Sequence, residues 1–267
     1  MSTDGMSKST FPAAALHWLE TILCERFGHA FTLQQDADAL TLALPGSEKR
    51  IRFDRLQQVF HQSRSDFPCE KWQASQAGFK APIDDSIPAP SEAKLPVPLI
   101  KMDKAGATVH YDILGLTYWM LSRLEEVGRT DLDEHKRFPA TSSHAYKHGY
   151  LERPIVDEWL NILGQVIQHV WPQRELKQHQ FSMKVSHDVD GPSRYGFRSA
   201  KGIVRAMVGD VVKRRDLKSA LLAPWIRLNS ARQLHPADPA NTFDWIMDQS
   251  ERHGLTSAFY FICGRTD

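Results

Sequence analysis

Apolar residues spaced three and four positions apart predict three helices in the first two thirds of the chain. The first begins near Pro12 and ends at Gly28, and its apolar face is Leu16, Leu19, Leu23 and Phe27. The second stripe is Ile113, Leu116, Met120, Leu124 and Val127. The third lies between Pro154 and Pro172 and consists of Val156, Trp159, Leu160, Leu163, Ile167 and Val170. We expect all three stripes to be buried in a core.

Alternation of apolar and polar residues predicts a β-hairpin between the first two helices. Leu40, Leu42 and Leu44 alternate with other residues and run into a Pro45–Gly46 turn, and residues 50–53 are the expected partner strand. Five prolines between Pro82 and Pro98 predict an irregular connector rather than regular structure. Residues 1–10 are expected to be disordered.

The pattern changes near residue 178, where a strand over residues 181–185 is expected. A long basic stretch follows, and then a helix with Asn241 as its N-cap and Phe243, Ile246 and Met247 on one face. His253–Gly254 closes this helix, and residues 255–262 are a second strand. Strand, helix and strand in this order predict a βαβ unit with parallel strands.

The chain is therefore expected to be an α/β protein of two domains, as its 267 residues allow. Residues 1–175 form an N-terminal α+β domain and residues 176–267 form the βαβ part, with a basic insertion at about 191–238. Ten Lys and Arg residues and two acidic residues lie between 191 and 235, although the net charge of the whole chain is only +1. We expect the insertion either to cover the mouth of a site as a solvated lid helix or to bind anionic lipid or glycan. Nucleic acid is not expected, because neither a recognised fold nor an aromatic stacking surface is present.

The cysteine pattern and the apolar runs indicate a location. Cys24, Cys69 and Cys263 form no CxxC pair or disulfide framework, which favours a reducing compartment. No apolar run approaches the roughly 20 residues that span a bilayer, and the first residues do not resemble a signal peptide. We expect a cytoplasmic protein.

Two aspartates stand where the strand after residue 181 should end. Ligands of parallel α/β folds bind beyond the carboxyl ends of the strands, and alternation places Asp188 and Asp190 on the same side. Two carboxylates this close repel each other unless a cation neutralises them, and hard divalent ions and zinc accept such oxygens. Gly191 allows unusual dihedrals or a close ligand, and Pro192 stops the ladder.

A purely structural interpretation stays open beside the metal site. Asp and Gly are common in turns and caps because of their local hydrogen bonds. His187 is a candidate metal ligand, but in an extended chain it points away from both aspartates, which favours a supporting hydrogen bond or a place on the far face.

The segment from Ser186 to Pro192, SHDVDGP, resembles the first motif of the polysaccharide deacetylases, the NodB-like carbohydrate esterases. Residues 243–264, FDWIMDQSERHGLTSAFYFICG, resemble the family's next helix and strand. Residues 111–126, 136–160 and 169–172 resemble a domain of unknown function that precedes the deacetylase domain in some bacterial proteins. The resemblance implies that residues 176–267 are the first βαβ part of an incomplete (β/α) barrel-like domain.

The same resemblance implies metal-dependent hydrolysis of N-acetyl groups on a polysaccharide or amino sugar, with a divalent metal such as zinc as cofactor. Asp188 would be the general base that takes a proton from the attacking water, and Asp190 would be a metal ligand. In the family a histidine pair in an HxxxH-like motif completes the metal site, and residues 191–267 contain no such motif. His144 and His148 have this spacing but lie in the other half of the chain and do not match the motif. The chain is therefore expected to be truncated after the second strand and inactive alone.

Two other classes of function also fit the aspartates or the insertion. In a haloacid-dehalogenase-type phosphatase Asp188 would be the nucleophile and Asp190 the acid/base beside magnesium, although Pro192 stands where Thr or Ser is expected. A glycosyltransferase with a DxD motif is less favoured, because no nucleotide-binding half precedes the motif. A non-catalytic protein that binds membrane or glycan through the basic insertion is the third alternative.

Overall fold

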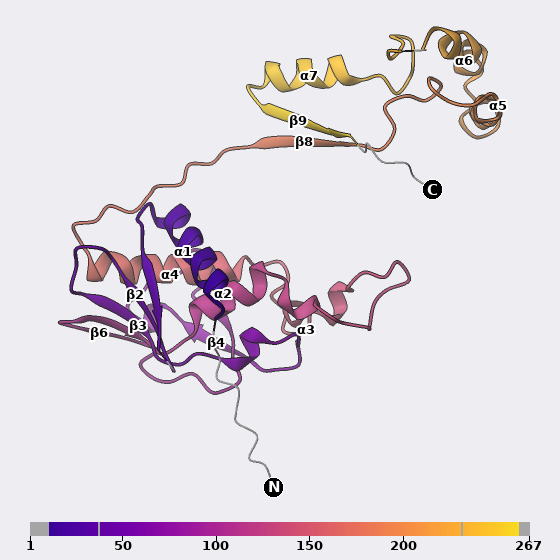
Figure 1. The fold of residues 1–267 in the computed structure, drawn as a ribbon. Helices are drawn as coiled ribbons and strands as arrows, with labels where there is room; N and C mark the ends of the chain where they lie inside the picture. Colours follow the sequence, from indigo (N-terminus) through magenta and orange to yellow (C-terminus); the bar gives the residue numbers. More distant parts are fainter. Residues whose placement is uncertain (1–10, 37, 231, 262–267) are drawn as a thin grey trace. The chain divides into compact units, whose positions relative to one another are not determined.

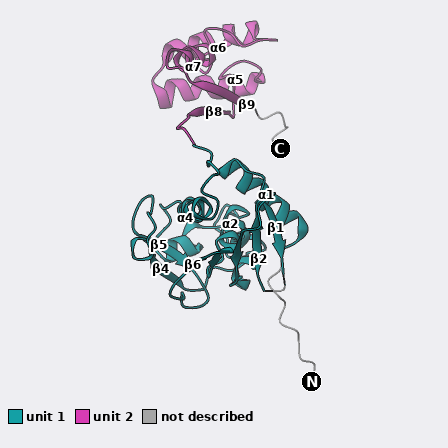
Figure 2. Cartoon of the chain, turned by 90° about the vertical axis from the view of Figure 1, so that its left-hand side faces the viewer, with its two compact units in different colours: residues 1–178 teal, residues 179–267 magenta. Residues whose placement is uncertain are grey.

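The chain forms two compact units in the computed structural model, which describes residues 11–36, 38–230 and 232–261. Unit 1 ends at Gln178 and unit 2 begins at His179 (Figure 2). The boundary expected from the sequence, after residue 175, lies close to this division. The predictions for residues 1–10 and for Cys263 concern positions outside the described residues.

Unit 1 is built on a mixed five-stranded sheet (Figure 1). In order across the sheet its strands are β1 (Thr32–Gln35), β2 (Leu40–Ala43), β3 (Arg50–Phe53), β7 (Gly106–Val109) and β6 (Ile100–Asp103). β2 pairs with β3 in antiparallel fashion, which confirms the predicted hairpin. β7 is parallel to β3 and antiparallel to β6, so this pairing joins distant segments.

The parallel pairing of β3 with β7 depends on a glycine. Gly106 has a φ of 140°, and a Cβ atom there would lie 1.8 Å from the carbonyl oxygen of Arg50. Any other residue would force the two strands apart, because no real Cβ contact is that short.

Three helices bury their apolar faces in one core with the sheet. They are α1 (Ala13–Phe27), α2 (Ile113–Leu121) and α4 (Ile155–Val170), and the short helices η1 (Gln58–His61), η2 (Ser75–Ala77), η3 (Leu124–Glu126), η4 (Ala140–Ser142) and α3 (His144–Lys147) lie between them. Gly28 ends α1 with a φ of 79°, and its N–H donates to the Cys24 carbonyl at 2.8 Å, as the sequence predicted. The predicted core faces of α1 and α4 are confirmed.

The second predicted stripe is wrong at its end. α2 stops at Leu121, and Arg123 has a φ of 53°, which turns the chain away. Leu124 falls in η3, and the side chain of Val127 is 59% exposed instead of buried. A helical spacing cannot continue through a residue in the left-handed region.

The connector predicted between Pro82 and Pro98 is also wrong in part. It contains β5 (Ser86–Pro90), which pairs with β4 (Cys69–Gln73) as an antiparallel ribbon. The N–H of Ser91 donates to the Pro68 carbonyl, so the odd-numbered positions of β5 bond toward β4. The backbone nitrogens and carbonyls of Pro88 and Pro90 therefore point away from β4. On that side of the strand the missing N–H groups remove no hydrogen bond of the ladder.

Side chains from other elements bind the outward carbonyls of β5. Tyr111 Oη donates to Pro90 at 3.1 Å, Trp159 Nε1 donates to Pro88 at 2.9 Å, and Arg153 donates to Ser86 at 2.9 Å. Donors on α4, on the loop before it and just before α2 thus satisfy a strand edge that would otherwise be a row of unpaired acceptors.

Unit 2 contains a two-stranded parallel sheet with one helix against it (Figure 1). β8 (Lys184–Val189) pairs with β9 (Thr256–Phe261), and α7 (Phe243–Arg252) contacts β9. The predicted βαβ order with parallel strands is confirmed, and the described residues form no closed barrel.

Two boundaries in unit 2 differ from the prediction. β8 begins at Lys184 rather than at 181, because its first partner is Thr256, and the Phe181 side chain is 93% exposed. Thr242, not Asn241, is the N-cap position of α7, since the Asn241 amide donates to the His235 carbonyl at 3.2 Å instead.

The basic insertion folds as a helical hairpin with its own small core. α5 (Ala200–Gly209) continues into one π-type turn, η5 (Asp210–Arg214), and α6 (Leu217–Asn229) packs against it. The core holds Tyr195, Ile203, Ala223 and Ile226. The fully buried carboxylate of Asp210 pairs with the guanidiniums of Arg194 and Arg214 and accepts a hydrogen bond from Tyr195 Oη at 2.5 Å.

None of the helices in the described part of the chain combines the length and apolar character needed to cross a membrane. Cys24 and Cys69 are both free thiols. A cytoplasmic location stays a prediction.

Candidate functional site

The two aspartates of the motif lie on one open face at the carboxyl end of β8. Burial alternates along the strand, so that Ser186, Asp188 and Asp190 are exposed while the residues between them are half-buried. Asp188 lies within β8 and Asp190 follows its last residue. The same-side placement predicted from strand periodicity therefore holds through this point.

His187 lies on the opposite face of the sheet, the face toward α7. Its ring stacks on Phe259, its partner in the parallel register, with ring centroids 4.8 Å apart. Phe243 of α7 contacts Phe259 in turn, at 5.3 Å between centroids. The Nε2 atom of His187 is buried and has no hydrogen-bond partner among the described residues. These contacts place the His187 side chain on the face of the sheet opposite to the one that carries the aspartates.

Tyr260 is the side chain across from Asp188. The two residues are register partners in the β8–β9 pair, and the Tyr260 side chain is 62% exposed. Sequence reasoning missed this residue, although the parallel register and strand alternation together would have indicated it. The open face therefore carries carboxylates from β8 beside a phenol from β9.

Neither carboxylate is engaged elsewhere in the described part of the chain. Asp188 and Asp190 accept no hydrogen bond there and form no ion pair. A turn or cap role would require backbone amides to donate to them. A Cβ atom at Gly191 would meet nothing within 4 Å, so this glycine is not required by crowding from the described atoms.

The loop that follows Asp190 is anchored by Asp238. Its carboxylate accepts hydrogen bonds from Ser193 Oγ at 2.6 Å and from the backbone N–H groups of Arg194 and Tyr195 at 2.9 and 3.0 Å. Burial alone would raise the pKa of Asp238, but these hydrogen bonds stabilise its charged form and the net shift is downward. Asp238 thus links residues 193–195, at the start of the insertion, to the end of the insertion. These bonds fix the loop that follows Asp190.

The aspartates do not by themselves complete a metal site. No group of three or more His, Cys, Asp or Glu side chains among the described residues is arranged to hold a metal ion. Catalytic zinc sites use three protein ligands. The donors described here therefore supply part of a ligand set and no more.

Two histidines of unit 1, His144 and His148, are held by hydrogen bonds within the fold. Nε2 of both His144 and His148 lies 3.0 Å from the carbonyl oxygen of Phe67, and since a carbonyl only accepts, both atoms carry the proton. His144 Nδ1 is then the acceptor of the Tyr150 hydroxyl at 2.5 Å. Burial, with a smaller effect of neighbouring His148, lowers the pKa of His144 to about 4. His144 is thus part of the core, and the exposed His148 bonds to the same carbonyl from outside it.

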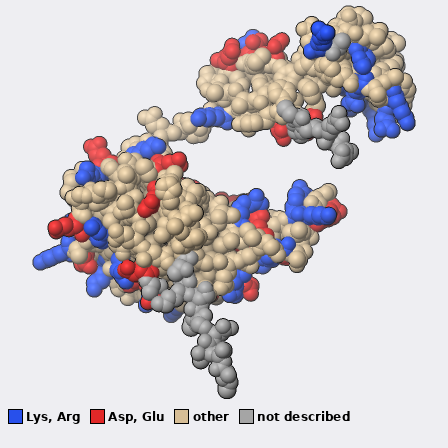
Figure 3. All heavy atoms as spheres, in the orientation of Figure 1, with Lys and Arg blue, Asp and Glu red and all other residues tan. Residues whose placement is uncertain are grey.

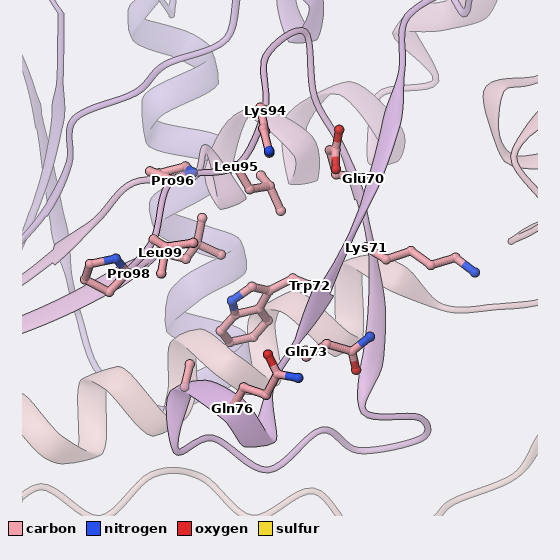
Figure 4. Close-up of a pocket in the computed structure, with 12 residues that line it drawn as sticks. Glu70, Lys71, Trp72, Gln73, Gln76, Lys94, Leu95, Pro96, Pro98 and Leu99 are labelled. Atoms are coloured by element: carbon pink, nitrogen blue, oxygen red, sulfur yellow. The ribbon is translucent and has the colours of Figure 1, made fainter.

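Unit 1 has a groove that sequence reasoning did not find (Figure 4). Its cavity of ≈ 360 Å³ lies between Trp72 and the segment 94–99. The polar side chains that line it are Glu70, Lys71, Gln73, Gln76 and Lys94, and none of them makes a hydrogen bond with another described residue. Its volume is within the range of small-molecule sites. One wall comes from the stretch that the prolines marked as an irregular connector, which explains why no site was expected there.

The chain is thus a mixed α/β protein, with a sheet-and-helix unit followed by a βαβ unit that carries free carboxylates. Residues 7–172 match a family of unknown function (DUF7033), and the chain belongs to this family. Neither a curated protein nor a solved structure matched the chain.

Proposed function

We propose that unit 2 contributes the base and one metal ligand to a metal-dependent carbohydrate deacetylase site. The reaction would be hydrolysis of N-acetyl groups on a polysaccharide or amino sugar. β8, α7 and β9 would be the first part of a barrel-like deacetylase domain. The observation that carries this proposal is the pair Asp188 and Asp190, exposed on one face at the carboxyl end of a parallel strand and free of other partners in the described residues.

The open carboxylates fit proton transfer. Asp188 would accept a proton from the water that attacks the N-acetyl carbonyl carbon. A general acid from outside the described residues would protonate the leaving nitrogen as the C–N bond breaks, which gives acetate and a free amine. Asp190 would be the ligand residue. His187 would act only indirectly, because it stacks on Phe259 on the opposite face of the sheet.

The described donors leave the metal site incomplete, so we derive no step through a metal from them. Zinc is the proposed ion, since its catalytic sites combine carboxylate with imidazole ligands. The further ligands would have to come from outside the described residues. We therefore propose that the 267-residue chain alone does not hydrolyse N-acetyl groups.

The first experiment measures acetate release from chitooligosaccharides in the presence of zinc. The 267-residue chain should release none. The genomic DNA after codon 267 should be sequenced, and any longer in-frame product that carries an HxxxH segment should be expressed and assayed. We expect such a product to be active and zinc-dependent.

Variants of that longer product separate the two roles. Asp188→Asn should lower the rate by roughly 10²–10⁴-fold with the zinc content unchanged, because only the base is lost. Asp190→Asn should lower the bound zinc as well. Asp244→Asn and Asp248→Asn, which alter exposed carboxylates on α7, are the matched controls and should change neither property. Full activity of Asp188→Asn, or a phosphorylated Asp188 trapped with a phosphate ester, would contradict the proposal, and the latter would indicate a phosphatase.

A further inference from the structure

Helix α6 has an apolar face that the other described residues of unit 2 leave exposed. Ala220, Ala223 and Ile226 are buried, which fixes the inner side of the helix. The outward side carries four large apolar residues with exposed fractions of 63%, 78%, 51% and 79%: Leu217, Leu221, Trp225 and Leu228. Their spacing of four, four and three residues places them on one continuous face.

The neighbouring helix repeats this arrangement. Ile203 is buried in the small core, while Val204, Val208, Val211 and Val212 are exposed along α5 and η5. A soluble helix normally shows one apolar stripe, toward its core. Here the core accounts for the inner stripes, whereas the outer ones stay exposed, and of them the Trp225 ring contacts His235 at 4.3 Å between ring centroids. Exposed apolar patches of this kind mark interaction sites.

The charges around this face are mostly positive. The exposed basic residues of the hairpin are Lys201, Arg205, Lys213, Arg214, Arg215 and Lys218. Of the two acidic residues, Asp210 is fully buried in its ion pairs, and Asp216 caps α6 by accepting from the Ser219 N–H at 3.0 Å. Figure 3 shows the basic side chains over the part of unit 2 that holds α5 and α6, and a group of acidic side chains over α7.

We propose that the α5–α6 hairpin binds the surface of an anionic phospholipid bilayer. The leucines, valines and Trp225 would enter the boundary between headgroups and acyl chains, and the lysines and arginines would contact lipid phosphates. The acidic side chains of α7 would be repelled from the same surface and so orient unit 2 on it. This surface is independent of the deacetylase proposal.

Charge and apolar character together select lipid over other occupants. A second copy of the chain would bring the same positive rim against this one, which opposes self-association. A soluble anionic polymer would pair with the basic side chains but leave Leu221 and Leu228 in water. An anionic bilayer satisfies both kinds of side chain at once.

The test is sedimentation of the full 267-residue chain with vesicles. Vesicles of phosphatidylcholine with phosphatidylglycerol should bind the chain, and vesicles of phosphatidylcholine alone should not. Raising the salt concentration should weaken the binding. Leu221→Glu/Leu228→Glu should lower the affinity at least about tenfold, because two apolar contacts are lost and two negative charges are added.

A matched control has the same change of charge and hydrophobicity elsewhere. Ile83→Glu/Val97→Glu replaces two exposed apolar residues of unit 1, 62% and 96% exposed, and should bind like the unaltered chain. An independent variant replaces Lys201, Arg205, Lys213 and Lys218 with Gln, none of which makes a hydrogen bond to a described residue. It should lose roughly fivefold in affinity for each basic residue that reaches the surface. Circular dichroism spectra should show that all variants keep their helix content.

Several results would overturn the proposal. The first is that the chain does not bind anionic vesicles. The second is that it binds neutral vesicles equally well. The third is that the control Ile83→Glu/Val97→Glu loses as much affinity as Leu221→Glu/Leu228→Glu. Dimerisation that Leu221→Glu/Leu228→Glu abolishes, seen by sedimentation velocity, would assign the face to a second copy instead. Binding of dextran sulfate that the glutamate variant retains, without vesicle binding, would assign the charge to a soluble polymer.

Discussion

Removing the guanidinium of Arg153 should destabilise unit 1 strongly. The Glu158 carboxylate is completely buried at the start of α4, and Arg153 is its ion-pair partner through two nitrogens, with Nε 2.9 Å from Oε1. The third nitrogen donates to the Ser86 carbonyl on β5 at 2.9 Å. Arg153→Ala would leave a buried charge without a partner and an acceptor on β5 without its donor.

The magnitude follows from the burial. Deleting one partner of a buried ion pair costs about 3–5 kcal/mol of unfolding free energy. In a domain of this size each kcal/mol corresponds to about 2–4 °C in Tm, so the Tm of unit 1 should fall by about 6–20 °C. An exposed ion pair gives a contrast. Arg137 contacts Asp133 at 3.2 Å with its side chain 69% exposed, and Arg137→Ala should cost no more than about 1 kcal/mol.

Urea unfolding followed by tryptophan fluorescence measures this difference, because five of the seven tryptophans lie in unit 1. The double variant Arg153→Ala/Glu158→Gln should recover part of the lost stability, since position 158 then holds a neutral amide instead of an unpaired charge. Equal effects of Arg153→Ala and Arg137→Ala, or no recovery in the double variant, would refute the buried-charge explanation.

Three further predictions concern other buried groups. The pKa of His144 is lowered to about 4, so below about pH 6.5 the unfolded chain takes up a proton that the folded state does not. The free energy of unfolding should therefore fall from pH 6.5 toward 4. In urea titrations at pH 7.5 and 4.5, His144→Gln should remove on the order of 3 kcal/mol of this pH dependence. Asp210→Asn should lower the free energy of unfolding by about 2–3 kcal/mol, because its fully buried carboxylate forms an ion pair and a hydrogen bond in the hairpin. Amide hydrogen exchange should become faster in α5 and α6 and stay the same in unit 1. Unchanged exchange in the hairpin would show that this carboxylate does not stabilise it. Trp159→Phe leaves the Pro88 carbonyl without its donor and should lower the Tm of unit 1 by about 2–12 °C, and a Tm within 1 °C of the original would show that water replaces the indole.

Local patterns determined the helices and strands whose limits are set within a few residues. α1 and α4 follow the predicted stripes, since Gly28, Pro154 and Pro172 stop the helices wherever they are packed. The alternation of Leu40 and Leu42 likewise gave β2, and strand periodicity placed Asp188 and Asp190 on one side of β8. These features depend on the geometry of a short stretch of backbone, which the sequence specifies directly.

Contacts between distant residues decided the rest. β5 is a strand despite Pro88 and Pro90, because β4 pairs with its other edge and Tyr111 and Trp159 donate to the carbonyls that the prolines leave outward. The sequence showed that a basic stretch follows Gly191, but it did not show that this stretch folds as a helical hairpin. The inner and outer apolar faces of the hairpin can be distinguished only once its two helices pack together. Strand periodicity placed the two aspartates on one side, but only the fold shows that no neighbouring group engages them within the described residues. A hydrogen-bond or packing partner far away in sequence leaves no local pattern, so tertiary structure alone decides which polar groups are satisfied and which stay available for chemistry.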